Sequence, residues 1–360
     1  MLETRNLKKV YKTKKGVSVT ALNDVSIKFP EKGLVFLLGK SGSGKSTLLN
    51  LLGGLDKYDE GEIIIKGVSS KDFKQSHFDS YRNTYVGFIF QEYNVLEEFS
   101  VGANIALAIE LQGKKATDEE INRILKQVDL EGFGDRKPNE LSGGQKRRVA
   151  IAGVLAMQPE VLLFDEPLSN LDAKLRESMR DELRALQKRL GITSLYVTHD
   201  QSEAMAISDR VVIMKDGVIC QQGTPTEIYE QPNSRFVANF IGKANFIDGT
   251  FRGMDGENAL VEVGGHTFPI PAPGKMEGVQ KDGPCCLAVR PESILLSEEE
   301  GPLPGRVSRA TYYGAKVEYE VMLGDQPIIV EVYNPQLSKR FAEGEAVHMT
   351  LIDRCVRVLA

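Results

Sequence analysis

Largely apolar runs of strand length recur through the first two thirds of this 360-residue chain. They occupy residues 34–38, 85–90, 161–164 and 194–198, and each is followed by a glycine or a polar side chain. Because the runs do not alternate with polar residues, they are typical of strands buried on both faces of a parallel sheet. The pattern predicts an α/β domain whose strands end at a common edge.

Between residues 91 and 159 the apolar positions change to a helical spacing. Thr117 and Glu120 have the spacing of a capping box, and Ile121, Ile124, Leu125 and Val128 then repeat on one helical face. We expect a helical subdomain at about residues 92–160, inserted into the α/β domain. A second amphipathic helix is expected after Asp172, with an apolar face that packs against the domain. That face comprises Leu175, Met179, Leu183, Leu186 and Leu190.

The last third of the chain carries short β-rich runs separated by Gly and Pro. They occupy residues 246–251, 259–263, 285–289, 307–313, 317–323, 328–332 and 347–352. Many short strands with turn signals between them predict a small all-β barrel. We therefore expect two domains, residues 1–240 and 241–360, with the transition beginning near residues 231–234.

A glycine-rich loop follows the first apolar run. Residues 39–47 read GKSGSGKST, in which the glycines allow successive N–H groups to face one anion and the next helix adds its positive end. Lys45 is expected to reach the terminal phosphates of a nucleotide, and the Ser46 hydroxyl to bind Mg²⁺. An ordinary glycine turn is the alternative, and the loop alone indicates only ATP or GTP. The expected nucleotide ligands are Gly39, Ser41, Gly42, Ser43, Gly44, Lys45, Ser46 and Thr47.

A second candidate anion site, at residues 141–145, precedes a helical stretch at residues 146–157. Ser142 is placed as an N-cap, and the N–H groups of Gly143, Gly144 and Gln145 would point toward a negative group. Since the first loop already surrounds one set of phosphates, this second cradle suggests a nucleotide held by another copy of the chain. A Ser-Gly-Gly sequence is also an ordinary helix start.

Polar side chains follow three of the other strands. Asp165 and Glu166 come after residues 161–164, Gln91 after 85–90 and His199 after 194–198. Because the carboxyl ends of parallel strands meet at one edge, these side chains should converge on the phosphate loop. Asp165 suits the outer ligand sphere of Mg²⁺, and Glu166 is placed to orient or deprotonate the attacking water. Separately, each could be a solvated loop acid or a capped surface group.

With these motifs, the first two thirds of the chain resemble the ATP-binding-cassette ATPases. In that resemblance residues 39–47 are the Walker A loop, 141–145 the signature, and Asp165 and Glu166 the Walker B pair. The resemblance further implies a Q-loop at Gln91, which reaches the metal and the attacking water, and a D-loop that contains Asp172. It also implies that His199 senses the γ-phosphate and that Tyr11 stacks on adenine. Simple packing is the alternative for Tyr11.

The remaining third resembles the oligonucleotide-fold-like regulatory domain of importer ATPases for ferric iron, polyamines, phosphonates and sugars. Residues 235–242 and 289–294 carry this resemblance. Nucleic-acid binding by such a barrel is not expected, because the net charge is −5 and no stripe of aromatic and basic residues is present.

Different segments of the chain resemble different groups of cassette ATPases. Residues 34–135 are most similar to ATPases of exporters and peptide-resistance systems, residues 145–157 to vitamin-uptake ATPases, and residues 162–242 to ferric-iron-type importers. An exporter ATPase therefore stays open as an alternative to an importer. A non-transport cassette ATPase is a minor one, because the chain has neither a long coiled-coil insertion nor a second Walker A loop, and a small-molecule kinase would lack the signature.

The resemblance implies a homodimer with two ATP–Mg²⁺ sites, each between the Walker A loop of one copy and the signature of the other. It also implies integral-membrane permease subunits and an extracytoplasmic solute-binding protein. No apolar run approaches the ~20 residues of a membrane span. We expect a peripheral protein on the cytoplasmic face of the cell membrane. The four cysteines lack metal-site spacing and are expected to be small core residues.

Overall fold

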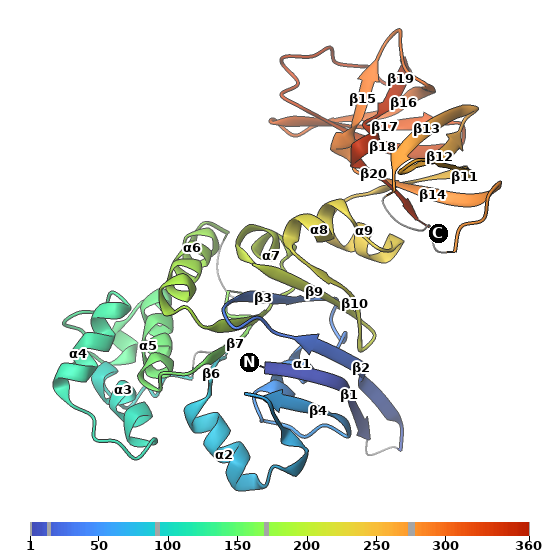
Figure 1. The fold of residues 1–360 in the computed structure, drawn as a ribbon. Helices are drawn as coiled ribbons and strands as arrows, with labels where there is room; N and C mark the ends of the chain where they lie inside the picture. Colours follow the sequence, from blue (N-terminus) through green and yellow to red (C-terminus); the bar gives the residue numbers. More distant parts are fainter. Residues whose placement is uncertain (1, 13–15, 91–93, 169–172, 273–277, 360) are drawn as a thin grey trace. The chain divides into compact units, whose positions relative to one another are not determined.

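The computed structural model describes residues 2–12, 16–90, 94–168, 173–272 and 278–359. It contains two compact units, Met1–Pro225 and Thr226–Ala360, which are called unit 1 and unit 2 (Figure 1). Among the described residues, no helix has both the length and the apolar composition needed to cross a lipid bilayer.

A six-stranded sheet forms the centre of unit 1, in the order β10-β9-β3-β8-β7-β6. Its strands are β3 (Gly33–Leu38), β6 (Val86–Ile89), β7 (Val161–Asp165), β8 (Thr193–Val197), β9 (Arg210–Lys215) and β10 (Val218–Gly223). All are parallel except β10, which pairs antiparallel with β9. Leu37 and Asp165 both align with Val197, so β3, β7 and β8 end side by side. This confirms the predicted α/β class.

An antiparallel sheet, in the order β2-β1-β4-β5, completes the core of unit 1. Its strands are β1 (Leu2–Lys12), β2 (Ser18–Lys28), β4 (Glu60–Ile65) and β5 (Val68–Ser69), followed by the short 3-10 helix η1 (Ser70–Asp72). One hydrophobic cluster contains side chains of both sheets together with Leu48, Leu49, Leu51 and Leu52 of α1 (Lys45–Leu52). The helix that starts at the phosphate loop is therefore buried in this core.

The helices of unit 1 include the expected insertion. They are α2 (Gln75–Thr84), α3 (Val101–Glu110), α4 (Asp118–Gln127), the 3-10 turn η2 (Pro138–Glu140), α5 (Gly143–Ala156), α6 (Ala173–Leu190) and α7 (Gln201–Ile207). Figure 1 shows α3, α4 and α5 grouped together. Thr117 caps α4 by accepting from Glu120 N at 3.3 Å, but the Glu120 carboxylate lies 3.6 Å from Arg123. Only half of the expected capping box forms.

Unit 2 contains two five-stranded antiparallel sheets that share one hydrophobic cluster. One sheet comprises β11 (Asn245–Asp255), β12 (Asn258–Val263), β13 (His266–Pro271), β14 (Gly283–Val289) and β20 (Val356–Leu359). The other comprises β15 (Ile294–Ser297), β16 (Leu303–Tyr312), β17 (Lys316–Leu323), β18 (Gln326–Tyr333) and β19 (Ala346–Leu351). The turns η3 (Pro291–Ser293) and η4 (Asp353–Cys355) precede β15 and β20. The predicted small all-β domain is confirmed.

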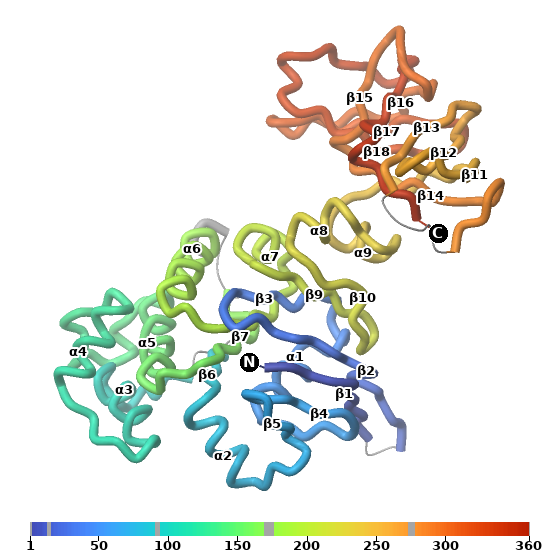
Figure 2. The backbone as a smooth tube through the Cα atoms, in the orientation of Figure 1, coloured from blue at the N-terminus to red at the C-terminus, as the bar shows by residue number. Residues whose placement is uncertain are grey.

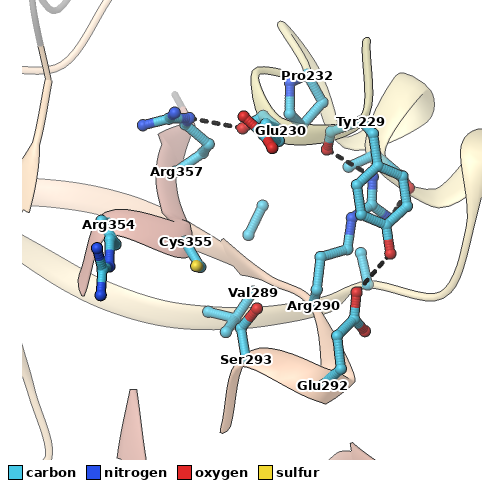
Figure 3. A pocket seen from close by; sticks show the side chains of 13 residues that line it. Tyr229, Glu230, Pro232, Val289, Arg290, Glu292, Ser293, Arg354, Cys355 and Arg357 are labelled. Atoms are coloured by element: carbon cyan, nitrogen blue, oxygen red, sulfur yellow. Dashed lines mark hydrogen bonds between the residues drawn. The ribbon is translucent and has the colours of Figure 1, made fainter. Parts of the chain in front are cut away.

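Two short helices, α8 (Pro225–Glu230) and α9 (Arg235–Ile241), are held against the barrel by hydrogen bonds. The buried Arg290 donates to Ala238 O at 2.8 Å and to Tyr229 O at 3.1 Å, and the Tyr229 hydroxyl donates to Glu292 at 2.5 Å (Figure 3). Figure 3 also shows Arg357, whose Nε donates to Glu230 O at 2.7 Å. The compact units divide after residue 225, ahead of the boundary expected after residue 240, because these contacts join both helices to the barrel.

All four cysteines are free thiols. Cys285 and Cys286 are buried on β14, and burial raises the pKa of both thiols. Cys355 is exposed, so the expectation of a core residue is wrong at this position.

Candidate active site

The glycine-rich loop lies between β3 and α1. Gly42 and Gly44 have φ of 79° and 99°, in the left-handed region that favours glycine. A Cβ added at Gly39 would lie 2.5 Å from Met214 O, and one at Gly44 would lie 2.5 Å from Ala21 O. Since both obstacles are backbone atoms, the loop requires glycine at these positions.

Lys45 lies folded over this loop. Its Nζ donates to Gly39 O at 2.9 Å and to Lys40 O at 3.2 Å, and the residue is only 7% exposed. Burial lowers the pKa of Lys45, and the charges of Glu166 and Asp165 oppose that shift. Nearby, the buried Ser43 hydroxyl has no hydrogen-bond partner among the described residues. A buried cation and an unsatisfied buried hydroxyl in a glycine-rich loop at the start of a helix fit a phosphate ligand.

The acidic pair lies at the neighbouring strand ends. Asp165 is the last residue of β7, and burial, followed by the Glu166 charge, raises the pKa of Asp165, whereas Lys45 acts to lower it. Glu166 N donates to Val197 O at 3.0 Å, which ties the residue to β8. Its carboxylate Oε2 lies 3.2 Å from Nδ1 of His199, whose side chain is exposed. Lys45, Asp165, Glu166 and His199 thus converge as the sequence predicted.

The backbone of Glu166 is unusual. Its φ is 44°, a left-handed conformation that a non-glycine residue rarely adopts. Strained backbone of this kind is concentrated at functional sites. The conformation lies directly after β7, where it directs the chain away from the strand end.

Hard oxygen ligands for Mg²⁺ are present at the strand ends beside the phosphate loop. Ser46 follows Lys45 in α1, and the Asp165 carboxylate lies at the adjacent strand end. Burial, followed by the charge of Glu166, raises the pKa of Asp165, and a divalent cation would offset both effects, so the donor set fits Mg²⁺. Gln91, the third proposed metal ligand, and Asp172 of the D-loop lie outside the described residues.

The second candidate cradle forms the start of α5. Ser142 Oγ accepts from Gln145 N at 3.3 Å, and Gln145 Oε1 accepts from Ser142 N at 2.9 Å, so the capping box is complete. A Cβ at Gly143 would meet no atom within 4 Å. No hydrogen bond or ion pair in the described part of the chain joins residues 142–145 to residues 39–47. This glycine-rich helix start therefore remains open to another ligand.

Arg147 is a residue whose role the sequence did not reveal. Three consecutive basic residues, 146–148, have the composition of a solvated helix face, but Arg147 is 2% exposed and its Nη2 donates to Pro167 O, directly after Glu166. Lys146 and Arg148 do pair at the surface, with Glu97 at 2.7 Å and Glu182 at 2.6 Å. The spacing of Arg147 from the buried Ile151 and Val154 was the available signal, because it places all three on one helical face.

Comparisons with known proteins agree with this geometry. A family model described as ABC transporter matches residues 22–169, and a TOBE domain model matches residues 287–359. A Fe(3+) ions import ATP-binding protein of Rhizobium etli is 45% identical over 306 residues, which cover 84% of this chain and 83% of the relative. A spermidine/putrescine import ATP-binding protein of Pseudomonas aeruginosa is 39% identical over 99% of this chain and 96% of its own length.

Solved structures show the same likeness for the cassette. A dimeric ATP-binding cassette in a post-hydrolysis state, bound to ADP and Pi, is 34% identical with a TM-score of 0.56. It covers 62% of this chain and 99% of its own.

Fold and site together define a phosphate-loop ATPase of the cassette type, with a second, all-β domain. The chain belongs to the ATP-binding proteins of ABC transporters, and it hydrolyses ATP.

Proposed function

We propose that this chain is the ATPase subunit of an importer and acts as a homodimer. Each ATP–Mg²⁺ would lie between residues 39–47 of one copy and residues 142–145 of the other. The observation that carries the proposal is the fully capped helix start at Ser142, which among the described residues makes no hydrogen bond or ion pair with the phosphate loop of its own chain. Its first N–H groups are suited to an anion from another copy. The dimeric form of the related cassette bound to ADP and Pi supports it.

The chemistry follows from the strand-end cluster. Glu166 acts as general base on water, and His199, 3.2 Å from the Glu166 carboxylate, responds to the γ-phosphate. Lys45 neutralises the terminal phosphates, while Ser46, Asp165 and Gln91 hold Mg²⁺, whose charge stabilises the developing negative charge on the phosphates. Tyr11 stacks on adenine, and Asp172, which lies outside the described residues, belongs to the residues that bind the nucleotide.

The dimer is tested with a hydrolysis-deficient variant. Glu166→Gln should bind Mg-ATP but hydrolyse it at least about 100-fold slower, because general base catalysis is lost. Light scattering after size-exclusion chromatography should show a dimer of this variant with ATP and a monomer with ADP. Adding Ser142→Arg should abolish the ATP-dependent dimer by placing bulk and charge in the interface. A mass that does not depend on nucleotide, or wild-type turnover by Glu166→Gln, would contradict the proposal.

Import is favoured by the TOBE match and by relatives named for Fe(3+) and polyamine import. We therefore propose integral-membrane permease partners, an extracytoplasmic solute-binding protein and a peripheral position on the cytoplasmic face of the membrane. Export is the second candidate, because residues 34–135 resemble exporter ATPases. Co-purification of membrane proteins with the tagged chain decides between them. A permease that works with a solute-binding protein supports import, whereas one with a large extracellular domain and no binding protein contradicts it.

A further inference from the structure

The hydroxyl of Tyr11 is held by a carboxylate. Tyr11 lies near the end of β1, is 40% exposed, and donates a hydrogen bond to Asp56 Oδ2 at 2.6 Å. Asp56 belongs to the loop that follows α1. The tyrosine is therefore connected to the segment directly after the phosphate-loop helix.

The other carboxylate oxygen of Asp56 is also occupied. Oδ1 accepts from Lys9 Nζ at 3.0 Å and from Lys57 N at 2.7 Å. Burial acts to raise the pKa of Asp56, but the hydrogen bonds from Tyr11 and Lys9 outweigh it and lower the pKa. Asp56 is thus ionised at neutral pH, and each of its carboxylate oxygens accepts hydrogen bonds that hold neighbouring groups in place.

Lys9 covers one face of the tyrosine ring. Its Nζ lies 4.9 Å from the ring centre, and the residue is only 8% exposed. With one face held by a cation and the hydroxyl held by Asp56, the orientation of the ring is set before any ligand arrives. The exposed part of Tyr11 is then available to a flat ligand.

We propose that Asp56 is a positioning residue for ATP: it holds the Tyr11 ring in register with the phosphate-loop helix, so that the surface for adenine is formed in advance. The inference rests on the proposed stacking of adenine on Tyr11. Fixing a side chain before binding removes an entropic penalty from the binding step. Loss of Asp56 should therefore weaken ATP binding about 3- to 10-fold without affecting the chemical step.

The experiment compares Asp56→Ala with the unchanged full-length chain in steady-state ATP hydrolysis. KM for Mg-ATP should rise about 5-fold while kcat stays within about 2-fold, since the interaction contributes equally to ground state and transition state. Inorganic tripolyphosphate, which has no base, serves as a competitive inhibitor, and its inhibition constant should not change. Glu60→Gln is the matched control, because Glu60 pairs with Lys8 of the same strand at 2.8 Å but does not contact Tyr11.

A double-mutant cycle tests the contact itself. Tyr11→Phe keeps the ring and removes the hydroxyl, so its effect on KM should not add to that of Asp56→Ala. Tyr11→Leu removes the ring and should raise KM more than either.

Equal weakening of ATP and tripolyphosphate by Asp56→Ala would overturn the proposal, because it would show a general distortion of α1. An unchanged KM in Asp56→Ala together with a raised KM in Tyr11→Leu would overturn positioning but leave stacking intact. An unchanged KM in Tyr11→Leu would remove Tyr11 from the adenine site, and the inference with it.

Discussion

At the scale of single residues, the surroundings of Asp165 disfavour the ionised form of its carboxyl group. Burial and Glu166 raise the pKa of Asp165, so the folded protein penalises its ionised form. That penalty is present above the raised pKa and vanishes as the pH falls below the ordinary pKa of a carboxyl group. Asp165→Asn should therefore raise the Tm of the nucleotide-free protein at pH 7, by about 2 °C, and the gain should shrink toward acidic pH.

Calorimetric scans over a pH series would measure this gain, with Asp135→Asn, at an exposed position between α4 and η2, as a control. A stability gain that stays constant down to acidic pH would contradict the explanation. The same substitution should weaken Mg²⁺-dependent ATP binding.

The residues of the phosphate loop, the acidic pair and His199 could be placed from the sequence, because each follows an apolar run whose end lies at the sheet edge. Arg147 and Asp56 could not. The spacing of Arg147 from Ile151 and Val154 indicates a buried face of α5 but not the carbonyl that it binds, which lies 20 residues away, and Asp56 acts on a strand 45 residues earlier.

At the scale of elements, α5 and the loop after β7 are joined through Arg147. Arg147→Ala would leave the buried Pro167 carbonyl without this donor and open a gap beneath α5. We expect a loss of about 2 kcal/mol or more in the free energy of unfolding, together with slower ATP hydrolysis, because Pro167 follows Glu166, the proposed general base. Arg148→Ala removes only a partly exposed pair with Glu182 and should change stability by less than about 1 kcal/mol.

Urea unfolding of both variants measures this difference. Equal midpoints would show that Arg147 contributes no more to stability than a surface arginine does.

The strands of unit 2 show what an apolar pattern can and cannot predict. The seven predicted runs correspond to β11, β12, β14, β16, β17, β18 and β19. The sequence did not predict β13, β15 and β20, because β15 and β20 have only four residues each and β13 contains two prolines. These strands form because their neighbours supply pairing partners, which short local patterns do not encode.

At the scale of the whole molecule, α8 and α9 belong energetically to the barrel. Ala238 of α9 packs with Cys286, Ala288 and Leu359, and Arg290 donates to carbonyls of both helices. A fragment of residues 226–360 should therefore unfold at least about 10 °C higher than one of residues 241–360, which leaves Arg290 buried without these acceptors. Both fragments retain every described strand of the barrel. Equal Tm values would support the boundary after residue 240 that the sequence predicted.

The left-handed backbone of Glu166 places selection for stability and selection for activity in conflict at this position. At a φ of 44°, glycine or asparagine would relieve strain that glutamate must bear. A library diversified at position 166 and sorted only for heat resistance should therefore accumulate Gly and Asn, whereas sorting for turnover should return Glu. The residues enriched at position 166 by the two selections would then differ. Such a difference would indicate that glutamate is retained for its proposed action on water.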